Sequence, residues 1–136
     1  MGATGTPWVV VDGPDERLRE RIKELGCLYA VARIAQGHEA DLDATLRAVV
    51  AAIPQGWRRP EALWAALVVD DRCFGEAGPD GPRMQQPVHV DGEPRGTLTV
   101  GYPQALAPAP GAAFLPEEEQ LLERLAAEVS VILERQ

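Results

Sequence analysis

The sequence has few of the residues that build metal sites. Among its 136 residues are two cysteines and two histidines. Cys27 and Cys73 are too few and too far apart for a metal-ligand motif. His38 and His89 have no cysteine or acidic partner at ligand spacing. We therefore predict reduced, buried thiols, solvated histidines, no metal site and no catalytic residue.

Basic residues are in the minority, and no long hydrophobic run occurs. The chain has 13 Lys and Arg against 21 Asp and Glu, a net charge of −8. Nucleic acids and anionic lipids bind clustered cations, so this balance predicts neither as a partner. No run approaches the roughly 18 apolar residues of a membrane span, and the first residues lack the pattern of a secretory signal. We expect a cytoplasmic protein that does not enter a membrane.

The hydrophobic content is sufficient for one core. It amounts to 46% of the 136 residues, which is typical of one domain. Residues 1–14 are rich in Gly, Thr and Pro, and we expect a flexible N-terminal tail there. Residues 15–136 are predicted to form a single folded domain.

Both ends of this domain carry helix patterns with a spacing of four and three. The first helix is predicted from a start at residues 12–16 to about Gln36, and the last runs from Pro116 to Gln136. This spacing averages 3.5 residues, which keeps an apolar stripe aligned with a neighbouring helix. We predict that the stripes form a dimer seam, with these residues: Leu18, Ile22, Leu25, Leu122, Leu125, Val129 and Ile132.

The middle of the chain predicts a short helix and two β-hairpins. Asp41 is a suitable N-cap for a helix through Ala52. The first hairpin joins residues 63–70 to residues 72–74, and the second joins residues 86–90 to residues 96–102. The order helix, helix, hairpin, hairpin, helix predicts an α+β fold, in which helices cover a face of one antiparallel sheet.

Several short segments form a pattern found in one family of signalling domains. They are residues 24–29, residues 31–33, Trp57 with Pro60-Glu61, residues 96–102 and residues 114–118. In this order they resemble the GAF-like sensor domain found beside bacterial and archaeal histidine kinases. The resemblance implies a GAF/PAS-like antiparallel sheet flanked by helices, with long N- and C-terminal helices. It also implies a homodimer, joined in cis or in trans to a histidine kinase or another output domain.

The resemblance also directs attention to a small-molecule pocket. Trp57, Trp64, Cys73 and Phe74 lie where they could border such a cavity, although buried aromatic residues also serve simply as core. The sequence lacks the signatures of cyclic-nucleotide and bilin-binding GAF domains, which disfavours those ligands. It points to no particular cofactor.

The sequence therefore favours a non-catalytic sensory domain that relays a signal through its terminal helices. Two alternatives stay open. One is a ligand-free protein-interaction scaffold, which has the same helices and sheet. The other is a small GAF-related redox enzyme, which would have to use Cys27 and Cys73.

Overall fold

The computed structural model describes residues 14–37, 41–108 and 113–135. The predicted tail, His38 and part of the 105–113 connection lie outside these residues, apart from Pro14. The described chain is α+β, with three α-helices, two short 3-10 helices and one sheet of four antiparallel strands. The elements are α2 (Pro14–Gly37), α3 (Leu42–Ala52), η1 (Ile53–Gly56), β1 (Trp64–Val69), β2 (Arg72–Gly75), β3 (Arg83–Val90), β4 (Glu93–Gly101), η2 (Gln104–Leu106) and α4 (Pro116–Glu134).

Local sequence signals set the bounds of α3. The Asp41 side chain accepts a hydrogen bond from the Ala44 N–H at 3.1 Å, and this confirms the predicted N-cap. Pro54 cannot donate to a preceding carbonyl, and the chain tightens there into η1. The helix is thus bounded by one capping side chain and one proline.

The sheet has the strand order β2-β1-β4-β3. Val69 pairs with Arg72, so Asp70-Asp71 forms the predicted first turn. The second hairpin is longer than predicted, because Val90 pairs with Glu93 and leaves only Asp91-Gly92 in the turn. Both turns contain residues with positive φ: Asp70 at 57°, Asp91 at 52° and Gly92 at 83°.

Two prolines lie within the strands of the second hairpin, and Pro94 falls in the segment predicted as its turn. Pro87 lies in β3, an edge strand, where an N–H on the free side is not needed. Pro94 lies in β4 before Gly96, the first residue of that strand to pair with β1. Each proline therefore occupies a position that lacks a neighbour on one side.

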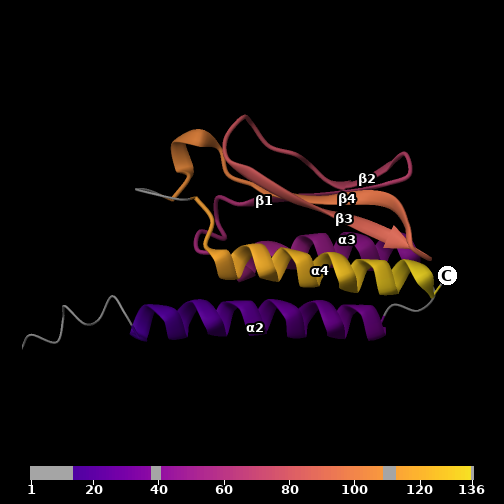
Figure 1. The fold of residues 1–136 in the computed structure, drawn as a ribbon, viewed down its shortest axis with the longest axis horizontal. Coiled ribbons are helices and arrows are strands. Elements are labelled where there is room, and N and C mark those ends of the chain that lie inside the picture. The colour runs from indigo at the N-terminus through magenta and orange to yellow at the C-terminus, as the bar shows by residue number, and fades with distance from the viewer. Residues whose placement is uncertain (1–13, 38–40, 109–112, 136) are drawn as a thin grey trace, which may run out of the picture.

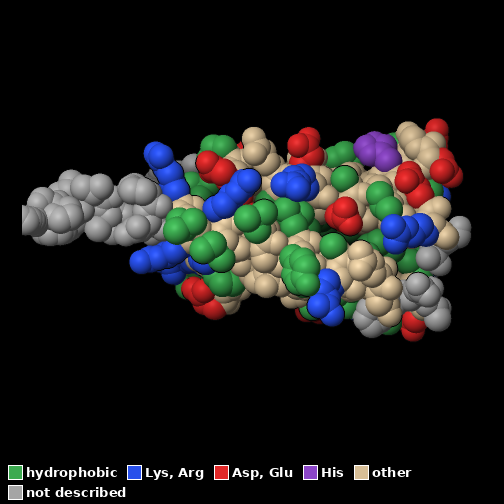
Figure 2. All heavy atoms as spheres, turned by 90° about the horizontal axis from the view of Figure 1, so that it is seen from below, with side chains coloured by type: hydrophobic (Ala, Val, Ile, Leu, Met, Phe, Trp, Pro, Cys, Tyr) green, Lys and Arg blue, Asp and Glu red, His purple; other side chains and the backbone are tan. Residues whose placement is uncertain are grey.

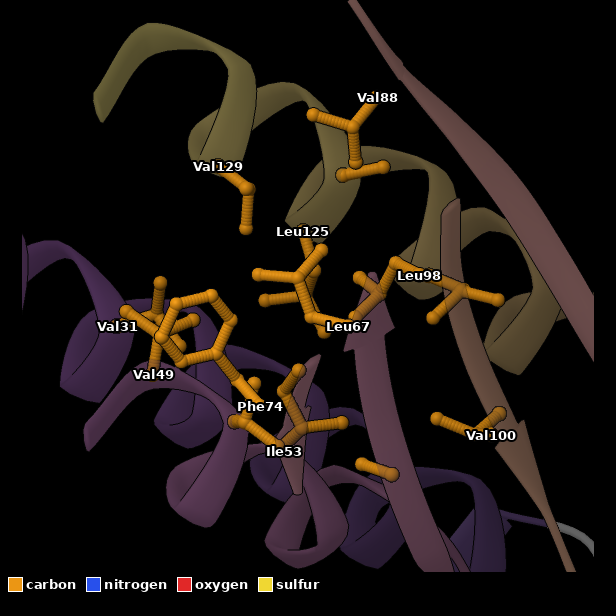
Figure 3. Packing of buried hydrophobic residues seen from close by; sticks show 14 of the residues in the cluster. Val31, Val49, Ile53, Leu67, Phe74, Val88, Leu98, Val100, Leu125 and Val129 are labelled. Carbon is orange, nitrogen blue, oxygen red and sulfur yellow. The ribbon is translucent and has the colours of Figure 1, made fainter. Parts of the chain in front are cut away.

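Three layers make up the fold (Figure 1). The sheet packs on α3 and α4, and α2 packs on the far side of these helices. Side chains from α3, α4 and one face of the sheet form the core, in which Leu67, Leu98 and Leu125 are fully buried (Figure 3). The helices thus cover one face of the sheet, as predicted.

Gly56 allows η1 to lie close to α2 and α4. A Cβ atom at this position would come within 2.6 Å of Leu121 Cδ2 and 3.0 Å of Cys27 Cβ. Both distances are shorter than ordinary van der Waals contact. The absence of a side chain at this position therefore allows η1, α2 and α4 to pack closely together.

The edge strand β3 is protected by side chains of α4. The N–H of His89 donates to Ser130 Oγ at 3.0 Å, and the N–H of Asp91 donates to Glu134 Oε2 at 3.0 Å. Pro87 offers no N–H at all. These features occupy donors that another strand would otherwise use for pairing.

Candidate functional site on the outer face of helix α2

The outer face of α2 presents a stripe of large apolar side chains. Leu18 is 59% exposed, Ile22 60%, Leu25 49% and Tyr29 65%. Figure 2, which looks at the molecule from the side of α2, shows hydrophobic side chains gathered on this face. We call these four residues the α2 stripe. No other part of the described chain covers them.

The opposite face of α2 carries acidic residues inward. Glu20 and Glu24 are 8% and 6% exposed, and Cys27 and Val31 are fully buried. These four residues have the same spacing as the α2 stripe. Each follows a member of the stripe by two positions in the sequence, which places it on the opposite face of the helix. In its first half, α2 therefore turns its carboxylates toward the domain and its leucine and isoleucine side chains toward solvent.

The two buried carboxylates lie beside the start of α4. Glu24 pairs with Arg21 at 3.7 Å and Glu20 with Lys23 at 3.8 Å. Burial raises the pKa of Glu24, and the nearby Glu117 adds to the rise, while Arg21 and Arg124 oppose it. The inward face of α2 is therefore polar at these two residues, and cations of α2 itself partly neutralise the charges of the two carboxylates.

The C-terminal stripe does not form the second half of a dimer seam. Leu122, Leu125 and Val129 are fully buried, and Ile132 is 4% exposed. Their side chains pack in the core beneath the sheet, where Val129 and Leu125 are visible (Figure 3). The prediction that these four residues face a partner is wrong, because α4 is already sandwiched between the sheet and α2. The candidate dimer residues that remain accessible are Leu18, Ile22 and Leu25.

Charge around the α2 stripe differs from that of the whole molecule. Over its full length, Pro14–Gly37, α2 has five basic and four acidic residues, a net charge of +1, whereas the chain carries −8. Glu20 and Glu24 are buried, so the exposed charges from Arg17 onward are cationic. Basic residues concentrate in the first half, at Arg17, Arg19, Arg21 and Lys23.

Glu118 holds the start of α4 to the loop that follows η1. Its carboxylate accepts hydrogen bonds from the N–H groups of Leu115 and Arg58, at 2.7 and 2.9 Å. Burial raises the pKa of Glu118, although these two hydrogen bonds and Arg58 act to lower it. The Tyr102 hydroxyl lies nearby, and burial raises its pKa to about 12.

Three consecutive glutamates, residues 117–119, begin α4 at the positive end of its dipole. Glu117 and Glu119 are exposed and suit a helix-dipole role. Glu118 is instead a buried anchor. It makes the glutamate half of a capping box with the Leu115 N–H, but leucine has no side-chain oxygen for the other half, so the sequence carries no capping-box signal that would identify Glu118.

The two cysteines lie in different environments. Cys27 is buried, with its Sγ 3.6 Å from the Ile53 carbonyl oxygen, and desolvation raises its pKa to about 12. Cys73 is exposed, so the prediction of a buried thiol there is wrong. Strand alternation explains the difference: Phe74 faces the helices, and its neighbour Cys73 therefore points away from them.

The four predicted pocket residues do not meet in one cavity. Trp57 is fully buried in the core, and Trp64 lies half-buried under the guanidinium of Arg83, 4.9 Å from the ring centroid. Cys73 faces away from the helices. Phe74 lines a cleft at the end of the sheet near the two hairpin turns, and the lining of this cleft includes none of the other three.

The described part of the chain offers neither a metal cluster nor a membrane-spanning helix. Within residues 14–37, 41–108 and 113–135, no group of three His, Cys, Asp or Glu side chains is placed to hold a metal ion. In the same residues, no helix is both long and apolar enough to cross a membrane.

Comparison with known proteins gives no relative. No family model, no curated protein and no solved structure matches this chain.

Proposed function

We propose that this chain is a non-catalytic sensory or signal-relay domain of the GAF-like kind, which self-associates through the α2 stripe. One observation carries the proposal: α2 exposes Leu18, Ile22, Leu25 and Tyr29 while it buries Glu20 and Glu24. An isolated globule would gain by the reverse arrangement, because apolar burial is favourable and carboxylate burial is costly. Contiguous exposed apolar residues with a polar rim are typical of interaction sites.

The partner that best fits the stripe is a second copy in antiparallel orientation. A parallel pair would bring the cationic side chains at residues 17–23 of two α2 helices together, and like charges repel. The antiparallel pair places Leu18 opposite Tyr29 of the second copy and Ile22 opposite its Leu25. Gly26 lies one turn after Ile22 and has no atoms near its missing side chain, which allows the helices to approach closely.

The stripe is suited to an exchangeable dimer. Full burial of a leucine or isoleucine contributes about 1.5–3 kcal/mol, so eight side chains that are roughly half exposed would contribute about 7–14 kcal/mol. Association itself costs about 4–15 kcal/mol in lost freedom. These terms are similar in size, so the dimer would form and dissociate reversibly. Such a balance allows an upstream or bound signal to shift the association.

The relay would act on a histidine kinase or another output domain. α2 contacts η1, α3 and α4, so a shift of α2 at the interface would be felt by the core that these elements form. The same association without a ligand would make the chain an interaction scaffold.

The redox-enzyme alternative has less support. Cys27 lies against η1, on the far side of the core from the outer sheet face that carries Cys73. The pKa of Cys27, raised to about 12 by desolvation, keeps this thiol protonated at neutral pH. The two thiols are therefore poorly arranged to act together.

Analytical ultracentrifugation of the full chain tests the association. We expect the wild type to shift from monomer to dimer as its concentration rises, and Ile22→Glu to remain monomeric. Leu106→Glu is the matched control, because Leu106 is 50% exposed on η2, away from α2. It should dimerise like the wild type. A wild type that stays monomeric at near-millimolar concentration, or an Ile22→Glu variant that still dimerises, would contradict the proposal.

A further inference from the structure

A cleft of about 270 Å³ opens at the end of the sheet where the two hairpin turns meet the beginning of α3 and the end of α4. None of its lining residues belongs to α2, so it is separate from the α2 stripe. The volume is slightly below the roughly 300–1,000 Å³ of pockets for drug-sized ligands. Its occupant must therefore be small.

Six of the nine residues that line the cleft are apolar. The aliphatic and aromatic residues come from both layers of the fold, with Leu46, Val69 and Phe74 nearly fully buried at the floor. The apolar members are Leu42, Leu46, Val69, Phe74, Val90 and Leu133. Such a floor would bind a hydrocarbon group and release water from it.

Two guanidinium groups stand at the rim of this floor. Arg95 donates through Nε and Nη2 to the two carboxylate oxygens of Asp70, each at 2.8 Å. Arg72 pairs with Asp43, and its guanidinium lies 5.5 Å from the centroid of the Phe74 ring. A guanidinium has five N–H donors, and the Asp70 pair uses two of those on Arg95. The ion pairs thus hold the two cations in place and leave donors for a ligand.

The unused N–H donors at the rim select a hydrogen-bond acceptor. Two arginines and Asp70 line the cleft, and Asp43 pairs with Arg72, so these four charges sum to zero. A ligand carboxylate would therefore accept from the guanidinium donors that the ion pairs leave open. A singly charged, planar carboxylate matches guanidinium geometry. A phosphate dianion would bring twice the negative charge of a carboxylate close to Asp70, which would repel it.

We propose that this cleft binds a small aliphatic carboxylate, with its carboxylate on Arg72 and Arg95 and its hydrocarbon chain on the apolar floor. The ligand would contact α3, both hairpins and α4 at once, and so link their positions. This inference supplies a ligand for the sensory part of the proposed function and rests on it only for that purpose, because binding needs no residue of α2.

NMR titration of the full chain with hexanoate tests the inference, with hexanol and hexylammonium as probes of the same chain length. Hexanoate should produce saturable shifts at the amides of Phe74, Val90 and Leu133. Hexanol and hexylammonium should bind at least about tenfold more weakly than hexanoate, because they lack charge-assisted bonds to the arginines. Equal binding of all three probes, or no shift at these amides, would overturn the proposal.

Variants test the role of the two arginines. The double substitution Arg72→Gln, Arg95→Gln should weaken hexanoate binding about tenfold while leaving hexanol binding unchanged. Arg59→Gln is the matched control, because Arg59 is exposed and precedes β1, at the opposite end of that strand from Val69. Hexanoate binding that survives the double substitution would overturn the proposal. If the double variant does not fold, the comparison of probes on the wild type still decides.

The failures of the two proposals can be told apart. Hexanoate shifts confined to residues 18–29 would place the probe on the α2 stripe, which overturns the cleft site and leaves self-association standing. A chain that binds hexanoate in the cleft but sediments as a monomer at every concentration overturns self-association and leaves the cleft site standing.

Discussion

Replacing Leu125 with alanine distinguishes a core leucine from an interface leucine. Leu125 was predicted from its spacing to face a partner, but it is fully buried between the sheet and the helices. Truncation of a buried leucine to alanine costs about 2–5 kcal/mol, through lost burial and the cavity left behind. Since a small domain unfolds in urea with an m-value of about 1–3 kcal/mol/M, the midpoint should fall by about 1–2 M. Chemical denaturation in urea, followed by tryptophan fluorescence, measures this loss.

Leu25→Ala is the matched comparison, because it makes the same chemical change on a side chain that is 49% exposed. Measured at concentrations where the chain is monomeric, it should lower the free energy of unfolding by less than about 1.5 kcal/mol. Its main effect should be on association. Each dimer loses two half-buried leucines, so the dissociation constant should rise about tenfold to a hundredfold.

The two variants therefore predict opposite profiles. Leu125→Ala should lose stability and, where folded, keep the dissociation constant of the wild type. The reasoning is refuted if Leu125→Ala leaves the urea midpoint unchanged while it abolishes association, because that result would place the C-terminal stripe at an interface. It is equally refuted if Leu25→Ala unfolds the monomer.

Three further predictions follow from single features of the fold. The free energy of unfolding should fall as the pH rises above the ordinary carboxyl pKa of 4.5 and through the raised pKa values of Glu24 and Glu118. In that interval the folded chain binds more protons than the unfolded chain. Urea titrations at several pH values measure this fall, and Glu24→Gln should flatten it. Gly56→Ala should lower the free energy of unfolding by about 1–3 kcal/mol, since its Cβ would lie 2.6 Å from Leu121 Cδ2; an unchanged urea midpoint would refute this close packing. A thiol reagent should label Cys73 rapidly in the native chain and Cys27 only after denaturation; mass spectrometry of Cys73→Ser should then show no native labelling.

The sequence predicted local structure better than it predicted which surfaces are covered. Asp41 as an N-cap and Asp70-Asp71 as a turn were identified because each signal lies within a few residues of the structure that it determines. Pro94 concealed the true start of β4, whereas Pro87 lies inside the strand predicted at residues 86–90. Their acceptance in strands depends on which side of each strand lacks a neighbour, and that is a property of the whole sheet.

The helical stripes show the same limit at the level of the site. A spacing of four and three defines a face of a helix but does not say what covers that face. Leu25 and Leu125 belong to equivalent patterns, yet one is exposed and the other is buried. Which face of α2 packs on the domain is decided by a second row of residues, in which Cys27 and Val31 continue a row that begins with Glu20 and Glu24. Carboxylates in an inward row were not anticipated, because burial of a carboxylate is unfavourable unless its neighbours compensate it.

The prediction for Cys73 depended on which face of the sheet this residue occupies in β2. β2 has four residues, of which only Phe74 is buried, so alternation along so short a segment gives no reliable face. The inward side follows from pairing, since Phe74 is opposite Leu67 of β1, and Leu67 is a core residue. Pairing partners cannot be read from a single short strand.

The hydrogen bonds from the β3 backbone to Ser130 and Glu134 also bear on the size that any assembly can reach. Strand-to-strand addition propagates without limit, because each new copy offers a fresh edge, whereas a twofold contact uses the same patch on both copies and is complete at two. With these donors at its longer border bonded to its own last helix, the sheet resists strand addition at that border, which suits the closed pair proposed above. Concentrated samples should therefore stay clear, and loss of the Ser130 hydroxyl is the change most suited to open the way to filaments.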